Sequence, residues 1–166
     1  MTVNPWRFDQ DYKSRYIELN PPIHVRFQRL SHGAGLPLPS PAKPGDAGLD
    51  LAAAIDLVVP GGGTQAVPTG FAVAIPAGHF GMVVPRSGLV RHSGVTVANS
   101  PGIVDSGYRG EIVVLLLNRG QSDFEVRRGQ RIAQMIVVPF SQFESVEVSA
   151  LDETERGKAG FGSSGS

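Results

Sequence analysis

The sequence predicts an all-β fold, a sandwich or barrel built from short strands. About a dozen short apolar or alternating segments follow one another at close spacing. No segment shows sustained helical periodicity. The 166 residues include 21 Gly and 13 Pro, which favour turns over long helices. A chain of this length has room for one domain with a real core.

The N-terminal part of the chain divides into an extension, a strand and a loop. Residues 1–22 are polar, and Pro21 and Pro22 would end any helix there, so we interpret them as an N-terminal extension. Residues 23–30 alternate apolar and polar side chains, which predicts a half-buried strand. Residues 31–46 are rich in Pro and Gly and predict a loop.

Short apolar runs between turn residues predict the other strands. These are residues 49–54, 55–59, 64–67, 71–75, 80–84, 95–98, 111–118, 124–126, 132–139 and 143–148. Pro and Gly at 68–70 and 76–78 predict turns, and residues 86–90 predict a short turn of helix. The domain therefore covers residues 23–150. Residues 151–166 end in a Gly/Ser-rich stretch and predict a flexible arm.

Composition excludes several classes of function. With 15 basic and 15 acidic side chains, the chain has no net field that would attract nucleic acid or an anionic membrane. It has no cysteine, which excludes disulfides, thiolate metal sites and a cysteine nucleophile. Its longest apolar run is far shorter than the roughly 20 residues of a membrane helix. We therefore expect a soluble, cytoplasmic protein.

Residues 101–120 (PGIVDSGYRGEIVVLLLNRG) form the most informative stretch. A short apolar approach, a Gly-containing turn and the apolar run 112–117 predict a β-hairpin. It places Asp105 and Tyr108 beside a turn braced by a buried strand, an arrangement that suits a pocket. An ordinary hairpin with an Asp in its turn has the same pattern, so this stretch alone leaves both interpretations open.

Three further segments combine Gly with charge or hydroxyl groups: residues 45–51, 85–89 and 156–164. Arg86, Ser87 and Gly88 offer a guanidinium, a hydroxyl and unhindered backbone N–H groups, which are the donors that a phosphate needs. Each segment also has a structural interpretation. Arg86 can be a surface charge, Ser87 a helix cap, and the last segment an unstructured end.

Taken together and in order, DAGLDL, PRSGL, GIVDSGYRG, RGQRIAQMIV and RGKAGFGSSG resemble the five motifs of the trimeric dUTP diphosphatases. The resemblance spans residues 23–164. It implies a distorted jelly-roll β-barrel subunit in a homotrimer whose active sites are shared between chains. It also implies Mg²⁺-assisted hydrolysis of dUTP to dUMP and pyrophosphate, which limits dUTP and supplies dUMP for thymidylate synthesis.

The resemblance implies a role for each motif residue. Asp105 would be the general base that activates the attacking water, and Tyr108 would pack under the deoxyribose and exclude a 2′-hydroxyl. A turn-capping Asp and a core tyrosine are the structural alternatives. Uracil would be bound by Asn99 and by the backbone of Gly102, Ile103 and Val104.

The phosphates would be bound by Arg86, Ser87 and Gly88. Gln134, with Arg131 beside it in the fourth motif, would support the phosphates and their waters, and a satisfied polar pair on a strand is the structural alternative for these two residues. Asp50 would orient water molecules on Mg²⁺, which is held mainly by the phosphates themselves. In the arm, Arg156 would contact the terminal phosphate, Phe161 would stack on uracil, and Gly162 and Ser163 would donate N–H groups.

Two other functions compete with this one. The related dCTP deaminases share the fold but need a glutamate as proton shuttle, and Leu115 occupies that position here. A non-catalytic nucleotide-binding β-barrel would keep the fold without the chemistry. The joint presence of Asp105, Tyr108, Arg86 and the complete tail argues against it.

Overall fold

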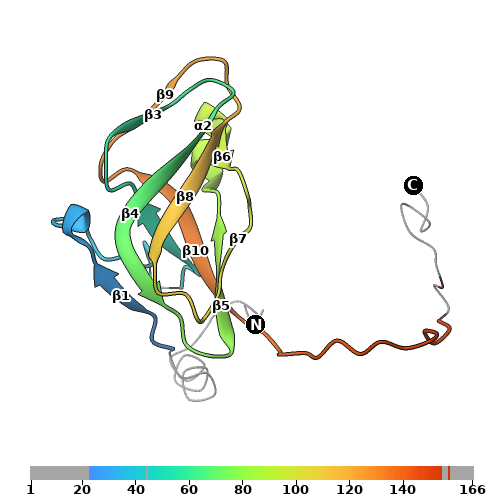
Figure 1. Cartoon of the computed structure of the whole chain (residues 1–166). Coiled ribbons are helices and arrows are strands. Elements are labelled where there is room, and N and C mark those ends of the chain that lie inside the picture. Colours follow the sequence, from blue (N-terminus) through green and yellow to red (C-terminus); the bar gives the residue numbers. More distant parts are fainter. Residues whose placement is uncertain (1–22, 44, 155–156, 158–166) are drawn as a thin grey trace, which may run out of the picture.

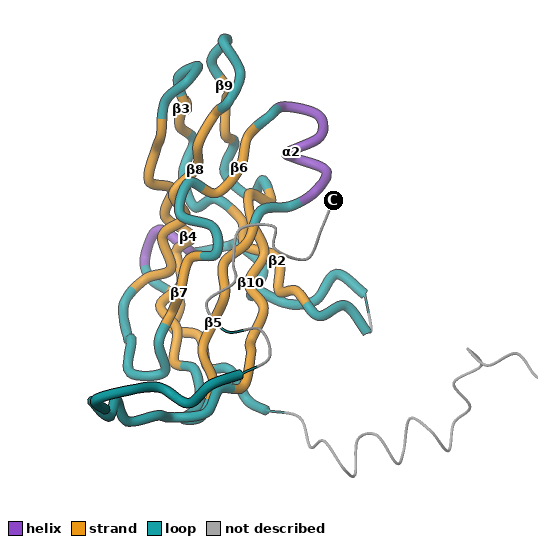
Figure 2. The backbone as a smooth tube through the Cα atoms, turned by 90° about the vertical axis from the view of Figure 1, so that its right-hand side faces the viewer, coloured by secondary structure: helices purple, strands orange, loops and turns teal. Residues whose placement is uncertain are grey.

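The computed structural model describes residues 23–43, 45–154 and 157, which form two packed four-stranded sheets and a two-stranded ribbon (Figure 1). In spatial order, the first sheet contains β1 (Arg26–Arg29), β4 (Thr64–Ala74), β8 (Glu111–Asn118) and β6 (Val95–Val97). The second contains β2 (Gly48–Ala52), β10 (Arg131–Pro139), β5 (His79–Val84) and β7 (Gly102–Val104), which lie side by side in Figure 2. All strand pairs are antiparallel. The all-β prediction is confirmed for the described residues, and two facing four-stranded sheets are the arrangement of a jelly roll.

The core lies between the two sheets and follows from alternation along each strand. In β8, Ile112, Val114 and Leu116 are buried, whereas Val113 and Leu115 between them are exposed. The buried set packs in one cluster with side chains of the opposite sheet, such as Leu51 and Met135. β8 thereby has one face in the core and one face outward, as a half-buried strand requires.

Smaller elements close the ends of the sandwich. β3 (Leu57–Val59) pairs with β9 (Phe124–Val126), and the 3₁₀ helix η1 (Ser31–Gly33) follows β1. The helix α2 (Ser87–Ser93) follows β5 and ends at Gly94, whose φ of 70° is left-handed. The short helix predicted at 86–90 is therefore confirmed and slightly longer. In the described part of the chain, no helix has the length and apolar character needed to cross a membrane.

Two strand predictions need correction. The strands predicted at 64–67 and 71–75 form the single strand β4, because Pro68, Thr69 and Gly70 make an irregularity in the strand rather than a turn. The strand predicted at 143–148 is absent. This segment leaves the sheets in an extended path (Figure 1) and pairs with no strand of the described residues. A segment becomes a strand only when it pairs with another strand, and the described residues provide no partner for this one.

The hairpin predicted at residues 101–120 is also wrong. β7 pairs with β5 in one sheet, whereas β8 lies between β4 and β6 in the other. The two strands are consecutive in sequence, but they belong to different sheets and each pairs with other strands. A turn closed by the Tyr108 N–H bond to the Asp105 carbonyl (3.0 Å) joins them. The gap between them is where the candidate site lies.

Asn118 provides a test of the fold. It is 1% exposed, and its amide donates to the carbonyls of Val59 (3.0 Å) and Ser122 (2.8 Å) and accepts from the Gly120 N–H (2.9 Å). Asn118→Ala leaves these groups without partners, so we expect a loss of about 2–4 kcal/mol of unfolding free energy. Thermal unfolding followed by circular dichroism measures it. The control is Gln121→Ala, which removes an exposed side chain from the same loop. Equal melting temperatures for the two variants would contradict the predicted contribution of the Asn118 hydrogen bonds to stability.

Candidate active site

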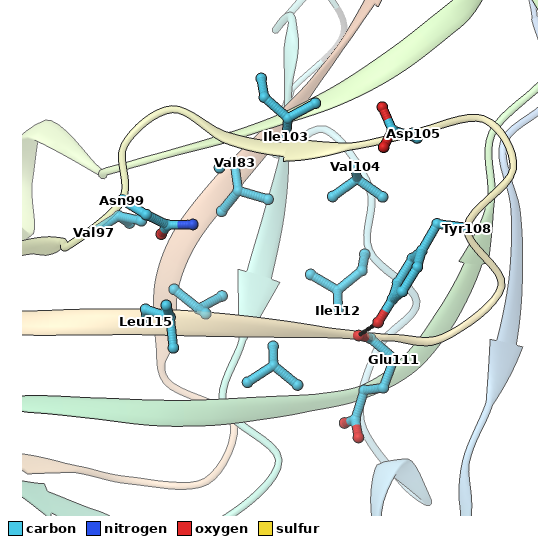
Figure 3. Close-up of a pocket in the computed structure, with 13 residues that line it drawn as sticks. Val83, Val97, Asn99, Ile103, Val104, Asp105, Tyr108, Glu111, Ile112 and Leu115 are labelled. Atoms are coloured by element: carbon cyan, nitrogen blue, oxygen red, sulfur yellow. Dashed lines mark hydrogen bonds between the residues drawn. The ribbon is translucent and has the colours of Figure 1, made fainter.

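A pocket of about 300 Å³ lies between β7 and β8 (Figure 3). Most of the residues that line it are apolar, and Asn99, Asp105, Tyr108 and Glu111 add polar groups, a mixture that is usual for a small-molecule site. The lining residues are Val83, Val97, Asn99, Gly102, Ile103, Val104, Asp105, Tyr108, Glu111, Ile112, Val113, Val114 and Leu115. The pocket thus brings together Asp105, Tyr108 and the four barrel residues that the sequence assigns to the uracil, which are Asn99, Gly102, Ile103 and Val104.

Asp105 and Tyr108 are both exposed residues of this pocket. Asp105 is exposed, and within the described part of the chain no hydrogen bond to its carboxylate is found. Its backbone carbonyl, not its side chain, closes the turn to Tyr108. Tyr108 is 45% exposed, so it is not a core tyrosine. Neither structural alternative from the sequence accounts for these positions.

The backbone of β7 forms one wall of the pocket. β7 is the edge strand of its sheet and pairs with β5 on one side, and no strand of the described residues pairs with its other side. An edge strand leaves N–H and C=O groups available to a ligand. Gly102 also leaves room for Asn99, because a Cβ at this position would lie 3.2 Å from the Asn99 Nδ2. Backbone groups and one carboxamide are therefore available at the same wall.

A second pocket, of about 410 Å³, contains the predicted phosphate residues. It is lined by Ala42, Asp46, Ala47, Gly48, Asp50, Arg86, Ser87, Gly88, Arg131, Gln134 and Ile136. The Gln134 side chain donates to the carbonyl of Pro85 (3.1 Å), which ties β10 to the segment that carries Arg86. The backbone of Arg86, not Ser87, is at the N-cap of α2, and no side chain caps this helix. The interpretation of Ser87 as a cap is therefore wrong.

Asp50 holds two arginines in this second pocket. One carboxylate oxygen accepts from Arg86 Nε and the other from Arg131 Nη1, both at 2.9 Å. The Asp50 side chain is 19% exposed, so the two ion pairs are partly shielded from solvent. Arg86 also donates to the carbonyl of Arg131 (3.3 Å). Asp50 thus fixes the direction of both guanidinium groups.

The two pockets of one chain share no lining residue. Asp105 and Tyr108 line the first pocket, whereas Asp50, Arg86 and Gln134 line the second. The structure therefore groups the predicted site residues into two sets and does not bring the sets together within one chain. The predicted arm residues Arg156, Phe161, Gly162 and Ser163 lie outside the described residues.

Several residues at the site had no assigned role in the sequence. The Glu111 carboxylate accepts from the Gly70 N–H (2.6 Å) and contacts His32 Nε2 (2.7 Å). The Arg109 guanidinium donates to the carbonyls of Ser106 and Tyr108, both at 2.6 Å, and so supports the turn from outside the pocket. Their partners are distant in sequence or are backbone atoms, so no motif spacing could indicate these contacts.

The residues fit a metal held by the substrate better than one held by the protein. Among the described residues, no three His, Asp or Glu side chains converge on one point. In the second pocket, both oxygens of Asp50 already accept hydrogen bonds from arginine. Mg²⁺ commonly keeps several waters and binds through phosphate oxygens, and a carboxylate oxygen that accepts one hydrogen bond still has a lone pair for such a water.

Residues 35–165 match the family model described as dUTPase. The chain is 51% identical over 148 residues to the deoxyuridine 5'-triphosphate nucleotidohydrolase of Beijerinckia indica, covering 87% of this chain and 92% of that protein. It is also 51% identical over 146 residues to the deoxyuridine 5'-triphosphate nucleotidohydrolase of Gloeobacter violaceus, covering 87% and 98% of the two chains.

Solved structures show the same likeness. The dUTPase of Staphylococcus bacteriophage 80alpha with dUPNHPP matches with a TM-score of 0.79 at 25% identity, over 86% of this chain and 99% of that chain. A mutant dUTPase from phage phi11 of S. aureus, described for its coordination of a structural Mg(II) ion, matches with a TM-score of 0.71 at 21% identity, over 77% and 98% of the chains. At this lower identity the likeness concerns the fold alone.

Proposed function

The chain belongs to the dUTPase family and hydrolyses dUTP to dUMP and pyrophosphate, and we propose that each of its active sites joins the first pocket of one subunit to the second pocket of another. The separation of the two residue sets within one chain supports this proposal. Asp105 in the first pocket would activate the water that attacks the α-phosphorus. The rest of the triphosphate needs cationic groups, and Arg86 lies in the second pocket. A symmetric oligomer brings two different patches of identical chains together.

The outer face of the second sheet supports a homotrimer. In an antiparallel sheet with one buried face, the outward side chains are expected to be polar. Here several are apolar and only partly buried: Phe80, Met82, Ile136 and Val138, with Ile103 56% exposed. They lie in adjacent strands in register, Met82 beside both Ile136 and Ile103. A continuous apolar patch of this kind is typical of a subunit interface.

The C-terminal segment supports an arm that acts on a neighbouring subunit. Phe143, Val146 and Leu151 are 87%, 77% and 84% exposed on a segment that leads away from the sheets (Figure 1). Such exposure of large apolar side chains favours packing against another chain. The arm, residues 151–166, follows the barrel domain (23–150) and would bring Arg156 to the terminal phosphate and Phe161 to the uracil. Gly162 and Ser163 would donate N–H groups there.

At the first pocket, the free edge of β7 and Asn99 bind the uracil edge, and the Tyr108 ring packs under the deoxyribose. Asp105 accepts a proton from a water whose oxygen attacks the α-phosphorus. The bond from phosphorus to the oxygen that bridges the α- and β-phosphates breaks, and pyrophosphate leaves. Leu115, which lines this pocket, cannot move a proton, so deamination of dCTP is not supported.

At the second pocket, Arg86, Ser87, Gly88 and Gln134 bind the phosphate chain. A guanidinium has more donors than the two that Arg86 uses in this structure, so donors remain for a phosphate. The dUTPase family uses Mg²⁺, which when bound neutralises charge on the phosphate oxygens. Asp50 would orient water molecules of that ion, while it holds Arg86 in place.

Mixing two inactive variants tests the shared site. Asp105→Asn disables the first pocket, and Asp50→Asn disables the second. If subunits of both variants are dissociated and reassembled together, about a quarter of the sites join two intact pockets. We therefore expect dUTPase activity well above that of either variant reassembled alone, measured as pyrophosphate release. Native mass spectrometry verifies that mixed trimers form. Mixed trimers without a gain in activity would show that one chain supplies the whole site.

A further inference from the structure

Gly110 is the backbone support on which the Tyr108 ring rests. A Cβ added at residue 110 would lie 2.4 Å from the Tyr108 Oη, 2.6 Å from Cζ and 2.9 Å from Cε2. These distances are far below any van der Waals contact, so the ring occupies the space that a side chain at position 110 would need. Gly110 does not line the pocket, whereas Tyr108 does. The ring therefore lies between Gly110 and the pocket.

A second contact fixes the tip of the same ring. The Tyr108 hydroxyl donates to the backbone carbonyl of Glu111 (2.8 Å), the interaction drawn in Figure 3. Glu111 is itself held, because its carboxylate accepts from the Gly70 N–H and contacts His32. The hydroxyl end of the ring thus lies against Gly110 and is held there by an anchored carbonyl. An exposed tyrosine without such contacts would sample several rotamers.

From these contacts we infer that Gly110 is a specificity-determining positioning residue, which sets how close the Tyr108 ring comes to the sugar of the substrate. This inference rests on the proposed role of Tyr108 as the wall under the deoxyribose. The Tyr108 ring can exclude a 2′-hydroxyl only if it cannot move away from the sugar. A displacement of the ring by about 1 Å or less then decides how well the enzyme discriminates dUTP from UTP. Gly110 and the Glu111 carbonyl provide that rigidity.

The substitution Gly110→Ala isolates this role. The φ of Gly110 lies outside the left-handed region, so alanine fits the backbone. The three atoms nearest to the alanine Cβ all belong to the outer part of the Tyr108 side chain. This side chain can rotate away without unfolding the barrel. We expect kcat/KM for dUTP to fall about tenfold or more, and the ratio of kcat/KM for dUTP over UTP to fall with it. The ratio falls because, in the Gly110→Ala enzyme, the deoxyribose of dUTP loses its contact with the Tyr108 ring, a contact that UTP does not make in the wild-type enzyme.

Gly107→Ala is the matched control. Gly107 lies in the same turn, its φ is also outside the left-handed region, and a Cβ there would meet nothing within 4 Å. We expect Gly107→Ala to retain wild-type activity and selectivity. Thermal unfolding of both variants verifies that each is folded. If Gly110→Ala matched Gly107→Ala in activity and selectivity, the inference would be wrong.

A double-mutant cycle with Tyr108→Ala separates the inference from the function on which it rests. If Gly110 acts through the ring, Gly110→Ala changes kcat/KM less than about twofold when the ring is already absent. An equal loss in both backgrounds would show that Gly110 acts by another route. If Tyr108→Ala alone keeps full selectivity against UTP, the proposed sugar wall itself is wrong, whatever Gly110 does.

Discussion

Asp105→Asn is expected to lower kcat for dUTP by roughly 10²–10⁴-fold, because the amide cannot accept the proton of the attacking water. The substitution keeps the size of the side chain. In the described part of the chain, the Asp105 carboxylate accepts no hydrogen bond that folding would lose. We therefore expect the variant to bind a non-hydrolysable dUTP analogue with an affinity within about threefold of wild type.

Single-turnover measurement of pyrophosphate release, with calorimetry for binding, checks both parts of this prediction. Asp123→Asn is the control, since Asp123 is an exposed acid whose Oδ1 accepts from the Gly61 N–H and lines neither pocket. It should turn over dUTP at the wild-type rate. A full rate in Asp105→Asn would remove Asp105 as the base. A large loss of affinity would instead place its main role in binding.

Asp50→Asn is expected to lower kcat/KM for dUTP by about 10²-fold. The carboxylate accepts from Arg86 and from Arg131 through different oxygens, and an asparagine keeps only one acceptor oxygen. Its NH₂ group would then face a guanidinium, which forces at least one arginine to move. Misplacing the Arg86 guanidinium by about 1 Å weakens its contact to the phosphates at the moment of reaction.

The dependence of the rate on Mg²⁺ separates two roles of Asp50. If Asp50 orients water molecules on the metal, Asp50→Asn raises the Mg²⁺ concentration needed for half-maximal rate. If its main role is to hold the arginines, that concentration stays unchanged while KM for dUTP rises. Asp46→Asn is the control, because Asp46 lines the same pocket but accepts from the Lys43 N–H (3.0 Å) rather than from an arginine. An Asp50→Asn enzyme with wild-type kcat/KM would contradict both roles.

The strands were predictable where alternation and turn chemistry agree. β8 has the predicted bounds, since its buried and exposed side chains alternate without interruption. The Pro68-to-Gly70 segment misled the prediction, because the same residues form a turn or an irregularity within a strand depending on the partner strand. The hairpin failed for a similar reason. Which strand pairs with β7 depends on contacts with β5, more than fifteen residues earlier, and local sequence does not encode them.

Motif order predicted the family and its reaction, but it did not predict the geometry of the site. Asp105 and Tyr108 share a pocket, and Arg86, Asp50 and Gln134 share another. The sequence indicated neither the pairing of Asp50 with both arginines nor the seat of the Tyr108 ring on Gly110. Such contacts depend on side-chain directions after folding, and spacing in sequence does not determine these directions.

The open edge of β7 bears on the tendency of the folded protein to aggregate. An unpaired strand edge invites other chains to add to it, which is a route to aggregation. β7 is three residues long, too short to hold a foreign strand in stable register. A pyrimidine base, by contrast, offers only a few hydrogen-bonding atoms along one side, so the same short edge is sufficient for it. The short length of β7 is therefore compatible with the proposed binding of a nucleobase through its open backbone, and it disfavours aggregation at this edge.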